Sequence, residues 1–290
     1  MTEILTREEV KGVIPPIVTP YKADESVDLE RFERELAVME ASGIELIIVG
    51  GSTGSGDELS AEDLEALVRI ASTRSRLRVI SGIITTTTKD AMRRAKLVRD
   101  AGASALLLCP PIYNSATEDS LFAFIDDVTK ASDLPIIFYD HYNYPVELLK
   151  RIAALSQVIA IKCVFQNVAE LVHSVGDRVT IAVGYDPITL AGYVMGAEAS
   201  IAGVHAVLPR ENVSVYRAFK RGDLTEAMRL TAAIGPISRE VSRSTNFTAR
   251  IKVAINLLGR NVGDPIRPLN DIPLGDREAI REGLRYAGVL

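Results

Sequence analysis

A lysine near the end of a predicted buried strand is the residue in this chain best suited to covalent chemistry. The window Val158–Val164 is apolar and rich in β-branched residues, which predicts a short buried strand with Lys162 close to its C-terminal end. Because burial of an unpaired ammonium group is costly, a buried lysine often has a lowered pKa and becomes a neutral amine that attacks carbonyl carbons. A lysine at a strand end also commonly reaches solvent and pairs with a carboxylate, so both interpretations stand here.

Several other predicted strands end in polar groups. They are Ser52 and Thr53, Tyr113 and Asn114, Tyr139 with Asp140 and His141, Gly184 with Tyr185 and Asp186, and His205. The turn that contains Ser52 and Thr53 combines backbone N–H groups with two hydroxyls and suits a small carboxylate, although glycine and serine are also ordinary turn residues. Tyr139 lies on the strand next to that of Lys162, so its phenol is either a partner of the amine or an aromatic filler of the core.

Metal chemistry and cysteine chemistry are weaker interpretations of these residues. Two histidines and two aspartates lie near strand ends, but they are on different strands and show no recognisable ligand spacing. We therefore predict no metal and no cofactor. Cys163 alternates with Lys162 along the strand, so its side chain is expected to face the surrounding helices and to serve packing.

The segments that must position these groups alternate regularly between strand and helix. The predicted strands are Gly12–Pro20, Glu45–Gly51, Arg78–Ile84, Ala105–Pro111, Pro135–His141, Val158–Val164, Thr180–Asp186 and Ala199–His205. The predicted helices begin after Asp28 and after Ser60, continue with Lys89–Ala101, Glu118–Ser132, Val146–Leu155, Val168–Val175 and Ile188–Met195, and extend from about Pro209 to the end. Eight such units in a chain of this length predict an α/β protein with a (β/α)8 TIM barrel.

The last helices have no strands to cover. We predict a barrel over residues 1–223 and a C-terminal helical extension over residues 224–290 that packs on the barrel or on a neighbouring subunit. In a TIM barrel the strand C-termini converge on one mouth, which brings the polar groups named above together. We expect His141, Gly184 and Val204 at that mouth to contact the substrate.

Composition narrows the class of protein. The chain has 290 residues, a net charge of −5, 47% hydrophobic and 24% charged residues, which is typical of a globular protein and gives no basic surface for nucleic acid. No apolar run is long enough to span a membrane, and Met1 to Lys11 is too polar for a signal peptide. The two cysteines lie in apolar windows, so we expect no disulfide and a cytoplasmic protein.

Several motifs occur together in register over nearly the whole chain. Gly50–Gly54 with Leu59 and Ser60 resembles the Gly-(Ser/Thr)-Thr-Gly-Glu segment of the dihydrodipicolinate synthase and N-acetylneuraminate lyase family of class I aldolases. Further matches to this family are Ala101–Asn114, Leu134–Tyr139, Ile159–Lys162, Ala249–Lys252 and Pro265–Leu269. Each motif is weak alone, but their joint occurrence is specific.

The resemblance implies an enzyme that binds pyruvate or another 2-oxo acid as an imine. Lys162 would form the imine, Tyr139 would relay protons, and Ser52 and Thr53 would hold the carboxylate. Tyr113 would cross a tight dimer interface to support the tyrosine. Members of the family are commonly dimers of dimers, so a homotetramer is expected. A protonated imine withdraws electrons, so it stabilises a carbanion at C3 without a metal.

The chain departs from the family pattern at four places. Ser55 stands where the family usually has glutamate, Ile112 replaces a tyrosine, and Asp140 to Tyr142 replace Asn-x-Pro. The arginine that grips the second substrate's carboxylate in dihydrodipicolinate synthases should fall at about Tyr144, where there is none. We therefore expect a second substrate other than aspartate semialdehyde, with a hydroxylated or neutral chain.

Three functions follow. The first is a lyase or aldolase that forms or cleaves a carbon–carbon bond at C3 of a 2-oxo acid. The second is a dehydratase or deaminase that uses the same imine on a 2-oxo-3-deoxy sugar acid or a cyclic imino acid. The third, from a different class, is a barrel that binds a 2-oxo acid without catalysis.

Overall fold

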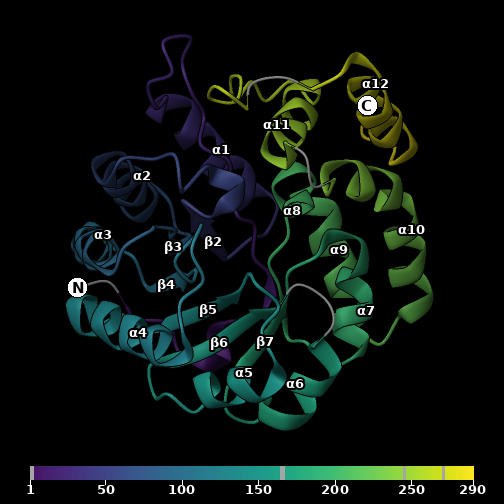
Figure 1. Cartoon of the computed structure of the whole chain (residues 1–290). Coiled ribbons are helices and arrows are strands. Elements are labelled where there is room, and N and C mark those ends of the chain that lie inside the picture. The colour runs from purple at the N-terminus through teal and green to yellow at the C-terminus, as the bar shows by residue number, and fades with distance from the viewer. Residues whose placement is uncertain (1–2, 164–166, 244–245, 270–271) are drawn as a thin grey trace.

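The chain forms a closed barrel of eight parallel strands surrounded by helices, as the computed structural model of residues 3–163, 167–243, 246–269 and 272–290 describes (Figure 1). The strands follow the order β1-β8-β7-β6-β5-β4-β3-β2. A bridge between Pro16 and Ile48 closes the ring between β1 and β2, with the Ile17 N–H donating to Ile48 O at 3.0 Å and the Ile48 N–H donating to Pro15 O at 2.9 Å. The predicted TIM barrel is confirmed.

The strands are shorter than the sequence predicts. They are β1 (Gly12–Val13), β2 (Leu46–Val49), β3 (Arg78–Ile83), β4 (Ala105–Leu108), β5 (Ile136–Asp140), β6 (Val158–Cys163), β7 (Thr180–Val183) and β8 (Ala199–Ser200). β1 ends early because Pro15 and Pro16 have no N–H to donate to a neighbouring strand. The predicted end of β6 at Val164 lies outside the described residues.

The prediction of the last strand is partly wrong. Ala199–His205 was expected to be extended, but β8 ends at Ser200 and Val204–Val207 forms the short helix α8. An apolar run of this length has no periodicity that separates a buried strand from a buried helix.

Helices cover the barrel in the expected alternation. They are α1 (Leu29–Ala41), α2 (Ala61–Arg74), α3 (Thr88–Ala101), α4 (Glu118–Ser132), α5 (Val146–Ala153), α6 (Val168–Val175), α7 (Thr189–Val194), α8, α9 (Pro209–Lys220), α10 (Leu224–Val241), α11 (Phe247–Leu257) and α12 (Leu274–Tyr286). Asp28 and Ser60 cap α1 and α2 as predicted, each accepting a backbone N–H at 3.0 Å. Short 3₁₀ turns occur at η1 (Arg7–Glu9), η2 (Ser52–Gly54) and η3 (Asp186–Ile188).

Side chains on the two faces of the strands enter different hydrophobic clusters. Those that point inward, such as Ile48, Ile137 and Ala160, fill the barrel interior. Those that point outward, such as Phe138 and Cys163, pack against the ring of helices. This alternation confirms the predicted outward direction of Cys163 and places its neighbour Lys162 on the inner side.

The C-terminal helices belong to a third cluster, which also contains Val18 after β1 and Leu190 and Tyr193 of α7. Residues of α8 to α12 pack together, and α11 and α12 lie beside α8 and α10 (Figure 1). Ion pairs from Arg260 to Glu35 and from Arg267 to Glu25 connect the end of the chain to its beginning. Across the described residues, none of the helices has both the length and the hydropathy needed to cross a lipid bilayer.

Candidate active site

Lys162 lies at the C-terminal end of β6, inside the mouth of the barrel. It pairs in register with Tyr139 on β5 and with Ala182 on β7. Its Nζ lies 3.8 Å from the centre of the Tyr139 ring, and only 7% of the residue is exposed. Gly184 makes room for it, because a Cβ there would lie 2.8 Å from Lys162 Cε.

Burial sets the protonation state of this lysine. Desolvation lowers the pKa of Lys162 to about 8, although the Cys109 thiol and the Asp186 carboxylate oppose the shift. At pH 7 about one amine in ten is therefore neutral and nucleophilic. Burial raises the pKa of the Tyr139 phenol well above its usual value, so the phenol keeps its proton at neutral pH and is able to donate it.

The predicted carboxylate turn is rigid. Ser52 and Thr53 belong to η2, and Ser55 ends this turn in a left-handed conformation with φ of 55°. Two threonines from distant segments hold it: Thr19 Oγ1 donates to Gly54 O at 2.6 Å, and Thr248 Oγ1 donates to Ser52 O at 3.4 Å. The turn is therefore fixed before any substrate arrives, which favours binding.

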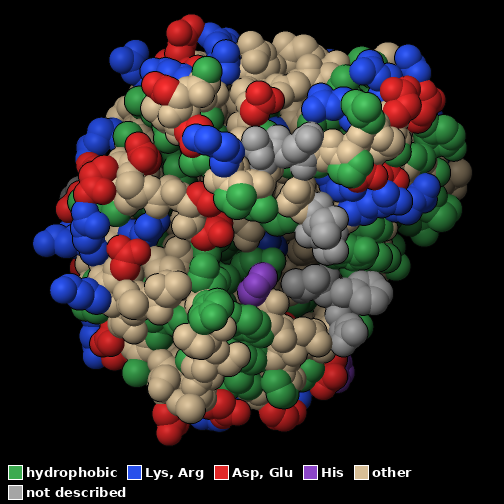
Figure 2. All heavy atoms as spheres, turned by 45° about the horizontal axis from the view of Figure 1, so that its top comes forward, with side chains coloured by type: hydrophobic (Ala, Val, Ile, Leu, Met, Phe, Trp, Pro, Cys, Tyr) green, Lys and Arg blue, Asp and Glu red, His purple; other side chains and the backbone are tan. Residues whose placement is uncertain are grey.

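A cavity of about 190 Å³ connects the lysine to this turn. Its lining residues are Pro16, Ser52, Thr53, Tyr139, Lys162, Gly184, Tyr185, Asp186, Ile201, Ala202, Gly203, Val241, Ser242, Phe247 and Ile251. The space-filling view shows a hollow near the centre of the face that it presents (Figure 2). The cavity brings together five of the eight predicted site residues: Lys162, Tyr139, Ser52, Thr53 and Gly184.

The wall formed by α10 and α11 was not predicted. Val241 and Ser242 at the end of α10 line the cavity, as do Phe247 and Ile251 of α11. Asp186 also lies there; its carboxylate accepts the Val204 N–H and a hydrogen bond from Ser242, while burial raises its pKa. The sequence identified Asp186 as a polar group at a strand end, but nothing in it linked α10 and α11 to the mouth.

His141 lies on an aromatic rim next to the cavity and is not among its lining residues. Its ring lies 5.4 Å from that of Tyr139 and 5.1 Å from that of Tyr142, in edge-to-face contacts. Burial and the charge of Lys162 lower its pKa, so the imidazole is neutral at neutral pH. Asp140 alternates away from the mouth: its Oδ1 accepts the Tyr144 N–H at 2.7 Å, and it positions the loop rather than a substrate.

Val204 and His205 do not reach the cavity. The Val204 side chain is buried among the C-terminal helices. Only its backbone N–H is connected to the cavity, because it donates to the carboxylate of Asp186. His205 is fully buried, with its Nε2 2.8 Å from Ser200 Oγ, so the expectation that strand 8 delivers it to the mouth is wrong. The described residues contain no group of three or more His, Cys, Asp or Glu side chains arranged to hold a metal.

Tyr113 lies far outside the cavity in the single chain. It is 94% exposed and has a φ of 76°, an unusual conformation for a large side chain. Its backbone hydrogen-bonds the Tyr142 hydroxyl, which also donates to Pro111 O at 3.0 Å. An ordered loop therefore presents this tyrosine to the outside.

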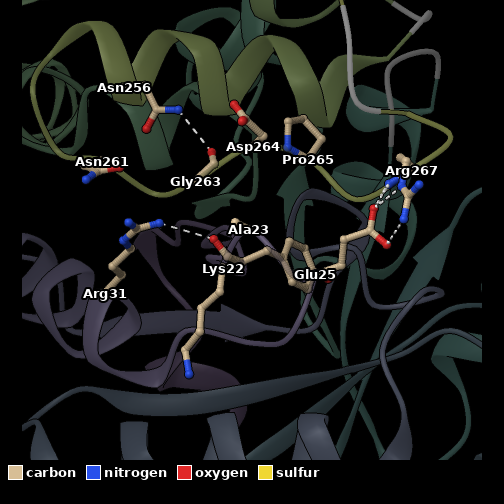
Figure 3. A pocket seen from close by; sticks show the side chains of 11 residues that line it. Lys22, Ala23, Glu25, Arg31, Asn256, Asn261, Gly263, Asp264, Pro265 and Arg267 are labelled. Carbon is tan, nitrogen blue, oxygen red and sulfur yellow. Dashed lines mark hydrogen bonds and ion pairs between the residues drawn. The ribbon is translucent and has the colours of Figure 1, made fainter.

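A larger cavity, of about 470 Å³, lies between the loop after β1 and the end of α11 (Figure 3). Two of its charged groups pair with each other, Arg267 with Glu25 at 2.7 Å, and a third, Arg31, donates to Tyr21 O at 3.2 Å. Asn256 donates to Gly263 O at 3.0 Å. The lining of this cavity includes Tyr21 and Lys22, but the Lys22 side chain points away from the other labelled lining residues (Figure 3), so the site around the buried Lys162 is the candidate for catalysis.

Comparison with known proteins extends this picture. Residues 9–286 match the Dihydrodipicolinate synthetase family. A 4-hydroxy-tetrahydrodipicolinate synthase of Methanothrix thermoacetophila is 32% identical over 276 residues, which cover 90% of this chain and 92% of that protein. One from Sorangium cellulosum is 32% identical over 290 residues, covering 95% of each chain. The crystal structure of a dihydrodipicolinate synthase from Agrobacterium tumefaciens superposes with a TM-score of 0.88 at 26% identity, covering 97% of this chain and 99% of that one.

Proposed function

The chain belongs to the dihydrodipicolinate synthetase family, and we propose that it is a class I lyase that acts on pyruvate or another 2-oxo acid. It forms or cleaves a carbon–carbon bond at C3 of that acid through an imine on Lys162. The observation that carries the proposal is a buried, partly neutral lysine that shares one small cavity with a protonated tyrosine and with a fixed Ser-Thr turn.

The residues divide the reaction among them. The Ser52 and Thr53 turn binds the carboxylate of the 2-oxo acid, which directs its C2 carbonyl to Lys162. The neutral amine attacks C2, and Tyr139 donates the proton with which the hydroxyl leaves as water. The protonated imine then accepts the electrons released when a proton leaves C3, giving an enamine. C3 of the enamine attacks the carbonyl carbon of a second substrate, and water finally releases Lys162.

Two other functions remain as alternatives. A dehydratase or deaminase would use the same imine, and a binding barrel would use the same cavity without turnover. The relatives named 4-hydroxy-tetrahydrodipicolinate synthase favour the carbon–carbon reaction over both.

The enzyme is expected to work as a homo-oligomer, a dimer of dimers. The support is Tyr113, an almost fully exposed aromatic residue held in a positive-φ conformation. In the dimer its hydroxyl would enter the partner's site beside Tyr139. Both cysteines are buried and free, which fits a reducing cytoplasm.

Trapping of the imine tests the proposal. Sodium borohydride reduction in the presence of pyruvate should add one reduced pyruvyl group to the wild type, as measured by intact mass. Lys162→Ala should lose the adduct completely, because no other lysine in the cavity can replace it. Lys252→Met, which removes a second buried lysine outside the cavity, should keep it.

The control separates two explanations of a lost adduct. If Lys252→Met also loses the adduct, the loss in Lys162→Ala reports on folding rather than on chemistry. If the wild type gives no adduct with pyruvate or with longer 2-oxo acids, the imine mechanism is wrong.

A further inference from the structure

We propose that the second substrate, which meets the enamine on Lys162, is a small, uncharged aldehyde with an apolar substituent. The inference rests on the proposed function and specifies the partner of the 2-oxo acid. It follows from the charge, the polarity and the size of the cavity.

The cavity offers no cation to a second carboxylate. Lys162 is the only lysine or arginine among its lining residues. Every lysine and arginine of the sequence falls within the described residues, so none is hidden in the gaps. Once Lys162 has formed the imine, its positive charge lies beside the carboxylate of the 2-oxo acid. It is then not available to pair with a second carboxylate.

Arg243, which follows α10, and Arg250 of α11 are already paired. Arg243 lies 3.4 Å from Asp276 and 3.5 Å from Glu240, and Arg250 bonds Asp276 and, at 3.3 Å, the Glu240 carbonyl. Arg250 is only 3% exposed. Withdrawing either guanidinium would leave Glu240 and Asp276 with one arginine instead of two, which opposes its recruitment to a substrate.

The one acidic group among the described lining residues also disfavours a second anion. Asp186 is held in place by the Val204 N–H and by Ser242. When ionised it repels a second anion, and when protonated it still supplies no positive charge. A carboxylate-bearing aldehyde would therefore lose its hydration without finding a counter-ion, whereas a neutral aldehyde has no such cost.

The walls contributed by Ile201, Val241, Phe247 and Ile251 are apolar. Ile201, Val241 and Ile251 are at most 1% exposed, while Phe247 is partly exposed at the start of α11. An apolar substituent gains by leaving water for such a surface. The volume of about 190 Å³ must hold both substrates and lies below the roughly 300–1,000 Å³ of pockets for larger ligands, so the aldehyde is small.

The proposed step is an aldol addition. C3 of the enamine forms a bond to the aldehyde carbon, the carbonyl π electrons move to the aldehyde oxygen, and that oxygen takes a proton. Water then adds to C2 of the imine and the Lys162 amine leaves, which gives a 4-hydroxy-2-oxo acid. No oxidant or reductant is needed.

A pair of aldehydes of equal branching tests the inference. With saturating pyruvate, 4-methylpentanal should be used at least about tenfold more efficiently in kcat/KM than 4-oxobutanoate, in which a carboxylate replaces the isopropyl group, because a lost ion-pairing partner costs at least this factor. Products are followed by mass spectrometry. Equal or faster use of 4-oxobutanoate would overturn the proposal.

Variants at Phe247 test whether this apolar wall causes the preference for the uncharged aldehyde. Phe247→Arg should reduce or reverse the preference for 4-methylpentanal, while Phe247→Leu should keep it; borohydride trapping with pyruvate confirms that each variant still folds. An imine that forms normally but condenses with neither aldehyde overturns this inference and leaves the proposed imine intact. Failure to form any imine overturns both.

Discussion

Two lysines of this barrel are buried over tyrosine rings, yet only one of them is placed for chemistry. Lys162 at the end of β6 has its Nζ 3.8 Å from the centre of the Tyr139 ring, and Lys252 in α11 has its Nζ 4.3 Å from the centre of the Tyr21 ring. Burial lowers the pKa of Lys162 to about 8 and that of Lys252 to about 7. By pKa alone, Lys252 would be the better nucleophile at neutral pH.

Access reverses that ranking. Lys252 has no exposed surface, and its Nζ donates to the Asp264 carbonyl at 3.0 Å. Lys162 lines a cavity that it shares with the Ser52–Thr53 turn. A lowered pKa therefore reports burial in both regions, whereas reactivity also requires space for a carbonyl next to the amine. Lys252 lies in α11, the helix whose Thr248 hydroxyl donates to Ser52 O.

Matched changes to the two tyrosines should give the largest difference between the regions. Tyr139→Phe keeps the ring beneath Lys162 but removes its proton donor, so the rate of imine formation with pyruvate should fall by about 10²–10⁴-fold. Tyr21→Phe makes the same change beneath Lys252 and should leave that rate close to wild type. Borohydride quenching at timed intervals measures both. Equal losses in the two variants would mean that Tyr139 acts only through packing.

The pH dependence of trapping should follow the pKa of Lys162 alone. Only the neutral amine attacks, so below a pKa of about 8 the rate should fall about tenfold for each pH unit, and above it the rate should level off. Lys252→Met should show the same profile as the wild type. A break near pH 7 that disappears in Lys252→Met would instead mean that Lys252, and not Lys162, forms the imine.

The smallest effect should appear in stability. The pKa of Lys252 is lower in the folded protein than its ordinary value, so its contribution to stability is complete above that ordinary value and is lost as the pH falls towards about 7. Lys252→Met removes this loss: between pH 9 and pH 7 the wild type should lose about 1–3 kcal/mol relative to the variant in the free energy of unfolding. Urea titrations at the two pH values measure this. Equal losses of unfolding free energy in the wild type and in Lys252→Met would mean that a group other than Lys252 causes the pH dependence.

The sequence was sufficient to predict that Lys162 and Tyr139 lie side by side. Lys162 and Tyr139 lie on strands that are consecutive in the chain, and consecutive units of a TIM barrel form neighbouring strands. Alternation then places both side chains on the inner face and Cys163 on the outer face, as the structure confirms. Both deductions use only local patterns and a simple topology.

The remaining wall of the site could not be predicted in this way. Val241 and Phe247 belong to amphipathic helices whose apolar faces are visible in the sequence, but a local pattern does not say which distant surface a helix covers. Val204 and His205 were misplaced for a related reason, since an apolar run fits a buried strand and a buried helix equally. Asp186 was visible as a polar residue, but its hydrogen bond from Val204 depends on that unexpected helix.

The hydrogen bond from Thr248 to Ser52 joins residues 196 positions apart, and the Arg267–Glu25 pair spans 242 positions. During synthesis from the N-terminus, the Ser52 turn therefore receives this hydrogen bond only after residue 248 has been made. The barrel strands are synthesised first, but the site they carry stays open until the last helices arrive. Synthesis of the strands and completion of the cavity wall are thus separated in time.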